Sequence, residues 1–314
     1  MHEASGKSYA KIILIGEHAV VYGYPANALP VKSIQLTAHL SPRTDHQQQI
    51  HSTFYVGTLQ AAATTAFDGI AELLEALLAH FGQAQAGFTL TIESALPPER
   101  GMGSSAATAT AVVRAVFAAC DAKLTRAELL KWTARSERVI HGNPSGLDAA
   151  TTSADAPQWF TKGHAPKPIA FPTNGTLVIA DTGIPGQTKT AVAAVAMHLQ
   201  ANPRATKPRL AAIGTAVQRA AAALVADDLV ALGRQLDNAQ TQLVALGVSS
   251  ALLDRLIAAA RNAGALGAKL TGSGQGGCLI ALAKDPNQAA QIQRALTAAG
   301  ASATWQYNFA AEAL

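Results

Sequence analysis

The segment that most clearly suggests chemistry is the stretch PPERGMGSSA, from Pro97 to Ala106. Gly101 and Gly103 can adopt backbone conformations closed to other residues, so successive N–H groups can converge on one anion. A helix predicted to follow adds its N-terminal N–H groups and the positive end of its dipole. Ser104 and Ser105 stand where one hydroxyl can cap the helix and the other can reach a phosphate-bound Mg²⁺. The pattern predicts a phosphate-binding loop, with a serine-capped glycine turn as the structural alternative.

A lysine in an apolar strand is the second feature. Lys11 lies in a predicted strand over residues 8–15 whose two faces are otherwise mostly apolar. Because an unpaired buried ammonium is costly, Lys11 should extend to solvent or meet an anion, either a phosphate or a catalytic carboxylate. Gly16, Glu17 and His18 form the turn that follows. A structural histidine is the ordinary interpretation of His18 taken alone.

Two carboxylates, Glu137 and Asp148, are the third candidate feature for chemistry. Glu137 follows Leu130 and Thr133 at helical spacing, so it is expected to point inward, where a carboxylate needs a cation. Asp148 comes after an Asn-Pro-Ser-Gly sequence that breaks the helix, and we expect it on a sharp loop, suited to meeting a substrate hydroxyl. Capping of a short helix by Ser145 and Asp148 is the alternative.

The last feature is a second glycine-rich segment, KLTGSGQGGCLIALA, over residues 269–283. It contains the spacing G-x-G-x-x-G, but a strand-like run follows it where a dinucleotide-binding fingerprint requires a helix. The interpretation that fits better is a pair of strands joined by a flexible glycine loop. A Walker A loop is also disfavoured, because no Gly-Lys-Ser or Gly-Lys-Thr occurs at the required spacing after residues 97–106.

Regular elements must hold these segments in place, and the apolar periodicity predicts both strands and helices. The predicted strands cover residues 8–15, 33–40, 48–54, 88–93, 268–271, 278–283 and 303–309. The predicted helices cover residues 59–81, 106–120, 188–199, 210–226, 228–243, 250–263 and 286–298, with one more from a capping box at Thr125 and Glu128 to about Val139. A change to Ala-rich helices places a domain boundary near residue 180, giving domains 1–180 and 181–314.

Composition narrows the class of protein. The chain has 314 residues, of which 49% are hydrophobic and 14% are charged, with a net charge of +4. These values exclude a disordered or collagen-like chain, and the lack of any run of Lys or Arg argues against a nucleic-acid partner. Cys120 and Cys278 are too few and too far apart for a disulfide framework or a zinc site. With no secretion signal or membrane-spanning pattern, we expect a soluble cytoplasmic protein.

Three of these segments, in this order, resemble the motifs of the GHMP kinase superfamily of small-molecule kinases. They are the lysine strand with its turn, the loop PPERGMGSSA, and the segment KLTGSGQGGC. The resemblance spans most of the chain. Within the superfamily, GEHAVVYG over residues 16–23 and HGNPSGLD over residues 141–148 are typical of the mevalonate kinase family. Glu99 and Arg100 are similar to its bacterial branch, and whether Arg100 touches phosphate or is solvated stays open.

The resemblance implies an α+β fold of two domains, the first resembling the second domain of ribosomal protein S5 and the second ferredoxin-like. It also implies ATP-dependent phosphorylation of the 5-hydroxyl of mevalonate. By motif match, Asp148 accepts or orients the hydroxyl proton, Lys11 supports it and the transferring phosphoryl group, and Ser105 and Glu137 hold Mg²⁺. The remaining matches are phosphate contacts at Pro98, Glu99, Arg100, Gly101, Met102, Gly103, Ser104 and Ser105, substrate contacts at Glu17, His18, Thr182 and Thr188, and a third glycine motif at Gly272, Gly274 and Gly276.

Two rival functions remain at this stage. One is another kinase of the superfamily, acting on phosphomevalonate or a sugar. The other is a nucleotide-binding protein of the same fold without catalysis, which the joint presence of Lys11, Ser105, Glu137 and Asp148 argues against. ATP and mevalonate are the expected partners, without nucleic acid or membrane, and a homodimer is compatible with the resemblance.

Overall fold

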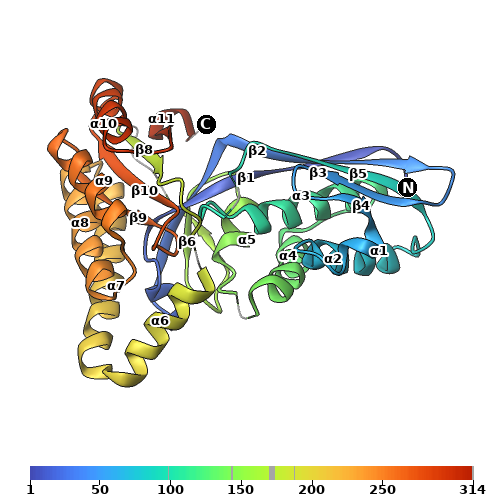
Figure 1. Cartoon of the computed structure of the whole chain (residues 1–314), viewed down its shortest axis with the longest axis horizontal. Helices are drawn as coiled ribbons and strands as arrows, with labels where there is room; N and C mark the ends of the chain where they lie inside the picture. The colour runs from blue at the N-terminus through green and yellow to red at the C-terminus, as the bar shows by residue number, and fades with distance from the viewer. Residues whose placement is uncertain (98, 143, 170–173, 187, 313–314) are drawn as a thin grey trace. The chain divides into compact units, whose positions relative to one another are not determined.

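Figure 1 shows the computed structural model of the chain, which describes residues 1–97, 99–142, 144–169, 174–186 and 188–312. The chain divides into two compact units built from discontinuous segments. Unit 1 comprises Met1–Ala10, Lys32–Pro97 and Gly103–Ser153, and unit 2 comprises Lys11–Val31, Pro98–Met102 and Ala154–Leu314. Each unit combines three separate stretches of the chain, so this division does not test a single boundary at residue 180. That boundary stays a prediction.

Unit 1 is built on a sheet with the strand order β4-β3-β5-β2, in which β1 also pairs with β2. The strands are β1 (Ala4–Ile15), β2 (Ala26–Arg43), β3 (Gln48–Ser52), β4 (Val56–Thr58) and β5 (Gly87–Ser94), with the residues of β1 and β2 divided between the two units. Along β2, Leu36, Ala38 and Leu40 are buried and alternate with more exposed residues, as expected for a sheet with one face on a core.

The helices of unit 1 are α1 (Leu59–Ala62), α2 (Asp68–His80), α3 (Ser104–Ala119), α4 (Arg126–His141) and α5 (Leu147–Thr152). Helix α3, predicted over residues 106–120, packs against α2, α4 and α5 and is buried almost all round. The capping box of α4 is confirmed. The single helix predicted over residues 59–81 is wrong, because the hydroxyls of Thr64 and Thr65 bond back to the carbonyls of Ala61 and Ala62 and end α1.

Unit 2 contains an antiparallel sheet of order β11-β8-β10-β9. Its strands are β8 (Thr176–Asp181), β9 (Gly267–Thr271), β10 (Cys278–Ala283) and β11 (Ala303–Asn308). The sequence did not predict β8, a short apolar run that a single sequence cannot assign to a strand by periodicity. Two shorter strands, β6 (Gln158–Phe160) and β7 (Lys167–Pro168), extend from Ala26–Ala28 of β2.

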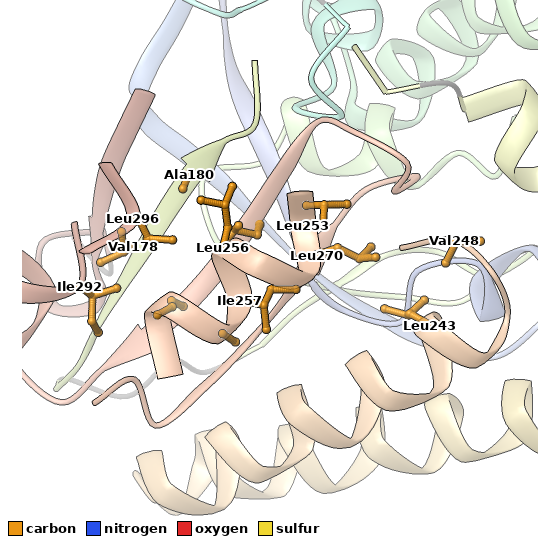
Figure 2. Close-up of a cluster of buried hydrophobic side chains, with 14 of the residues drawn as sticks. Val178, Ala180, Leu243, Val248, Leu253, Leu256, Ile257, Leu270, Ile292 and Leu296 are labelled. Atoms are coloured by element: carbon orange, nitrogen blue, oxygen red, sulfur yellow. The ribbon is translucent and has the colours of Figure 1, made fainter. Parts of the chain in front are cut away.

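Helices complete unit 2. They are η1 (Ala19–Tyr22), α6 (Thr188–Ala201), α7 (Pro203–Val225), α8 (Leu229–Ala245), α9 (Ala251–Asn262), α10 (Pro286–Ala298) and α11 (Phe309–Glu312). Leu253, Leu256 and Ile257 of α9 meet Leu270 of β9 and Val178 of β8 in one buried cluster (Figure 2). In the part of the chain that the structure describes, no helix has the length and apolar character needed to span a membrane.

Candidate active site

The predicted phosphate loop is an irregular segment that leads into α3. Gly101 and Gly103 have φ values of 75° and 76°, in the left-handed region that favours glycine. Met102 is buried, and its carbonyl accepts a hydrogen bond from the Lys11 N–H at 2.9 Å. Glu99 is exposed, while Pro98 lies outside the described residues. The loop conformation therefore depends on glycine at the two positions that the sequence singled out.

The serine cap expected for the following helix is wrong. Gly103 is the N-cap residue of α3 and no side chain caps it, so Ser104 and Ser105 are the first two residues of the helix itself. Glycine can occupy the cap because it adopts the required positive φ without steric cost. Both serines thus lie in the first turn, where the backbone N–H groups have no partner within the helix.

The two predicted metal ligands are brought together in unit 1. The Ser105 hydroxyl donates to Glu137 Oε1 at 2.7 Å, and Glu137 is buried on α4, as its spacing predicted. His141 Nε2 lies 3.2 Å from Ser105 Oγ and 3.9 Å from Glu137 Oε2. Because the single serine proton goes to Glu137, the His141 N–H donates to Ser105. Sequence reasoning did not select His141, although it lies one helical turn after Glu137.

Asp148 is on a helix and not on the sharp loop predicted for it. It is the second residue of α5, whose N-cap is Gly146 with a φ of 87°. The Ser145 hydroxyl accepts a hydrogen bond from the Leu147 N–H at 3.2 Å, and no side chain caps the helix. A short new helix therefore begins after Gly146, and Asp148 is half-buried in its first turn, while Asn143 of the predicted break lies outside the described residues.

Lys11, in unit 2, is buried with 2% of its surface exposed, so its ammonium group does not extend to solvent, and the contact with an anion stays a prediction. A second buried lysine was missed. Lys269 on β9 forms an ion pair with Glu17 Oε1, and both side chains are inaccessible to solvent. Burial raises the pKa of Glu17 and lowers the pKa of Lys269. The same reasoning that selected Lys11, a lysine in an apolar strand, would have selected Lys269.

His18 occupies a rare backbone conformation next to this ion pair. Its φ is 60° and its ψ is −47°, and the Ala19 N–H donates to the Glu17 carbonyl at 2.6 Å, forming a γ-turn centred on His18. Its Nε2 is 2.9 Å from the Ser273 carbonyl, and since that oxygen only accepts, Nε2 carries the proton. Burial lowers the pKa of His18 to about 4, so the ring is neutral near pH 7.

The glycines of the third motif pack closely against the backbone of other segments of unit 2. A Cβ on Gly272 would lie 3.2 Å from the Cα of Gly101, and one on Gly274 would lie 1.9 Å from the Val248 carbonyl oxygen. A Cβ on Gly276 would lie 2.6 Å from the Pro185 carbonyl oxygen. The two glycine-rich segments are therefore direct neighbours, at Gly101 and Gly272.

The two threonines predicted to contact substrate differ in their surroundings. Thr182 is buried, and its hydroxyl donates to the Gly277 carbonyl at 2.8 Å, which gives it a structural role within unit 2. Thr188 is the exposed first residue of α6. Neither observation tests a substrate contact, so both assignments stay predictions.

The chain shares its pattern with known kinases. Residues 68–154 match the family described as GHMP kinases N terminal domain, and residues 220–302 match GHMP kinases C terminal. The chain is 32% identical to the mevalonate kinase of Thermococcus onnurineus, with 93% of this chain and 92% of that protein covered. The chain belongs to the mevalonate kinase family.

Solved structures of this family have the same fold. The crystal structure of Leishmania major mevalonate kinase in complex with R-mevalonate is 28% identical, with a TM-score of 0.84 over 96% of this chain and 94% of that one. The mevalonate kinase of methicillin-resistant Staphylococcus aureus is 32% identical, with a TM-score of 0.74 over 99% of this chain and 100% of that one. The predicted α+β fold of two GHMP kinase domains is confirmed.

A kinase of the mevalonate kinase family uses ATP together with a divalent cation, and Ser105 and Glu137 fit such an ion. Their hydroxyl and carboxylate oxygens are 2.7 Å apart, and hard divalent cations prefer oxygen ligands. The first turn of α3 supplies N–H groups beside them for a phosphate group. The donor set thus suits a cation bound jointly by the protein and by phosphate oxygens.

Proposed function

We propose that this member of the mevalonate kinase family transfers the γ-phosphoryl group of ATP to the 5-hydroxyl of mevalonate. The observation that carries the proposal is the identity of 32% to a mevalonate kinase over 93% of the chain. The close pairing of Ser105 with Glu137 at the start of α3 supports it independently, because phosphoryl transfer requires a cation beside a phosphate cradle.

The proposed acceptor chemistry centres on Asp148. Its carboxylate accepts the proton of the mevalonate 5-hydroxyl as the hydroxyl oxygen forms a bond to the γ-phosphorus, and the bond from that phosphorus to the β,γ-bridging oxygen breaks. By the motif match, Lys11 supplies the positive charge that supports Asp148 and the transferring phosphoryl group. Glu17, His18, Thr182 and Thr188 are the proposed contacts to mevalonate. A neutral His18, with Nε2–H donated to Ser273, presents Nδ1 as an acceptor for a substrate hydroxyl.

The proposed donor chemistry centres on the phosphate loop. Gly101, Met102, Gly103 and Ser104 line the phosphates, and Glu99 and Arg100 flank them, with Pro98 assigned by motif alone. Ser105 and Glu137 hold Mg²⁺, which neutralises phosphate charge when bound. Gly272 supports this loop by packing against Gly101, whereas Gly274 and Gly276 pack against the Val248 and Pro185 carbonyls and are assigned to the site by motif alone.

The test of the acceptor role is Asp148→Ala, with Asp148→Asn as the isosteric variant. We expect kcat with mevalonate to fall by about 10²-fold to 10⁴-fold, because proton removal by a positioned base contributes this much. The affinity for a non-hydrolysable ATP analogue, measured by calorimetry, should stay within about twofold of the wild type. Asp155→Ala, at an exposed position of unit 2, is the control and should retain full turnover. Retained turnover, or a loss of turnover that accompanies a loss of nucleotide binding, would contradict the role of Asp148.

The substrate itself is tested by ADP release from MgATP with mevalonate, phosphomevalonate, galactose or no acceptor. Turnover with mevalonate alone is the expected result. Turnover only with phosphomevalonate or galactose would keep the superfamily and reject this acceptor. Nucleotide binding without turnover for any acceptor would favour a non-catalytic protein of the same fold.

We also infer that the enzyme acts in the cytoplasm on small molecules and not on nucleic acid. The small net charge of +4 and the lack of any Lys or Arg run in the sequence support the exclusion of nucleic acid. A homodimer is compatible with the family, and light scattering after size-exclusion chromatography measures the oligomeric state directly.

A further inference from the structure

The sequence leaves two possibilities for the Arg100 side chain, which are contact with phosphate and exposure to solvent. In the structure it forms an ion pair within the protein. Arg100 Nε donates to Asp181 Oδ2 at 3.0 Å, and the two side chains are 18% and 7% exposed. Asp181 is the last residue of β8, and 81 positions separate the partners. An ion pair inside unit 2 therefore ties the phosphate loop to a strand of the sheet.

The same aspartate also holds the turn that follows β8. Its Oδ1 accepts a hydrogen bond from the Gly183 N–H at 2.9 Å, and the Gly186 N–H donates to the Glu99 carbonyl at 2.7 Å. Residues 99–100 and 181–186 are thus joined at two points, by one ion pair and one backbone hydrogen bond. Two attachments restrict the orientation of the loop more than either one alone.

The third glycine motif also restricts the backbone conformation of the phosphate loop, through close packing. A Cβ on Gly277 would lie 2.9 Å from the Arg100 carbonyl oxygen, and Gly101 lies against Gly272. The backbone at residues 100–101 is therefore enclosed by the glycine motif, while the Arg100 side chain extends to Asp181. Little freedom is left for the segment that presents N–H groups to an anion.

The Arg100–Asp181 ion pair contributes more to the conformation of the loop than to the stability of the fold. Nη1 of Arg100 is buried and has no hydrogen-bond partner among the described residues, so the nearby Asp181 carboxylate is what compensates the guanidinium charge. Desolvation of two charges offsets most of their attraction, so an ion pair of this kind adds little net stability. What it does supply is a fixed direction for the Arg100 backbone.

We propose that Arg100 and Asp181 are positioning residues whose ion pair holds Glu99–Met102 in the nucleotide-binding conformation before ATP arrives. The proposal rests on the proposed function for the identity of the ligand. When only a fraction of the protein is competent, the apparent dissociation constant rises by the inverse of that fraction. A fall of the competent fraction to about one tenth weakens nucleotide binding about tenfold.

The experiment measures the affinity of the full-length protein for a non-hydrolysable ATP analogue with Mg²⁺, by calorimetry. We expect Arg100→Gln and Asp181→Asn each to weaken binding about tenfold, and their double variant to weaken it no further, because both act through one contact. Arg100→Lys should recover part of the affinity, since it keeps the charge. KM for mevalonate should change less than about twofold in Arg100→Gln, a split that general loss of stability would not produce.

The matched control is Arg261→Gln, which breaks the Arg261–Asp237 ion pair of the same unit. It should leave nucleotide affinity unchanged, and urea unfolding of all variants reports their stability. Wild-type affinity in Arg100→Gln would overturn the proposal. So would weak binding in Arg100→Gln with normal binding in Asp181→Asn, because Arg100 would then touch phosphate directly.

These outcomes separate the proposal from the function it rests on. If the wild type binds the ATP analogue but turns over no mevalonate, the proposed function fails while the comparison of nucleotide affinities still decides the role of Arg100. If the wild type does not bind the analogue at all, the positioning role is wrong.

Discussion

The two glycine-rich segments use the same residue type for opposite purposes. In residues 99–103, glycine permits a backbone conformation, and a Cβ on Gly101 would meet no other atom closer than 3.5 Å. In residues 272–277, glycine permits close approach, and a Cβ on Gly274 would lie 1.9 Å from the Val248 carbonyl oxygen. A Cβ at Gly101 would make ordinary van der Waals contacts, whereas a Cβ at Gly274 would overlap neighbouring backbone.

The difference teaches how to interpret a glycine pattern. The G-x-G-x-x-G spacing at residues 272–277 matches a nucleotide-binding fingerprint, yet these glycines make room for neighbouring backbone. The loop in which glycine serves its own backbone conformation is the one that leads into a helix N-terminus, as anion binding requires. The element that follows the glycines, a strand or a helix, distinguishes the two cases better than the spacing.

The largest effect that would test this comparison is expected for Gly274→Ala. Its Cβ would overlap the Val248 carbonyl, and its φ of 79° is unfavourable for alanine, so we expect about 4 kcal/mol of lost stability. Urea unfolding followed by circular dichroism measures it. Gly163→Ala, with a φ of 83° and no atom within 4 Å, is the control and should lose only about 1 kcal/mol. Equal losses at the two positions would contradict the close packing of the second segment.

The next effect concerns His18, whose Nε2 bonds the Ser273 carbonyl of the second segment. Burial lowers the pKa of His18 from 6.5 to about 4, so between these pH values the unfolded chain binds a proton that the folded chain does not. The contribution of His18 to stability therefore falls as the pH falls through this range, by about 3 kcal/mol in total, and this contribution changes no further below pH 4.

Urea unfolding of the wild type and of His18→Asn across this pH range isolates the contribution. Asparagine tolerates the positive φ and does not titrate, so the variant should lack this part of the pH dependence. Parallel curves for the two proteins would show that His18 is protonated as easily in the folded chain as in the unfolded one.

The smallest effect on stability is expected for Gly101→Ala in the first segment. Because space is available, only the positive φ of 75° opposes alanine, and we expect a loss of about 1 kcal/mol. Affinity for the ATP analogue should nevertheless fall at least about tenfold, since the N–H groups lose their alignment. Gly23→Ala, with a φ of 87° and open space, should lose similar stability without any loss of affinity. Unchanged nucleotide affinity in Gly101→Ala would remove the distinction between the segments.

Local patterns explain which parts of the site could be predicted. The inward direction of Glu137 came from helical spacing and is confirmed by its burial, and the capping box of α4 came from two residues three positions apart. The loop expected at Asp148 is wrong, and the alternative of a short helix is the one that the structure has, although Gly146 is its N-cap and no side chain caps it. The role assigned by motif match to Asp148 stays a prediction that Asp148→Ala tests, and the role of Lys11 stays a prediction.

The sequence by itself determined the order of the motifs, most helices and strands, and the residues able to handle phosphate and protons. These features depend on neighbours within one or two turns, where periodicity and caps act. Only the tertiary structure decided which charges meet, because Arg100 and Asp181 are 81 positions apart, and Lys269 and Glu17 are 252 apart. The order of strands in a sheet selects such partners, and no local spacing encodes it.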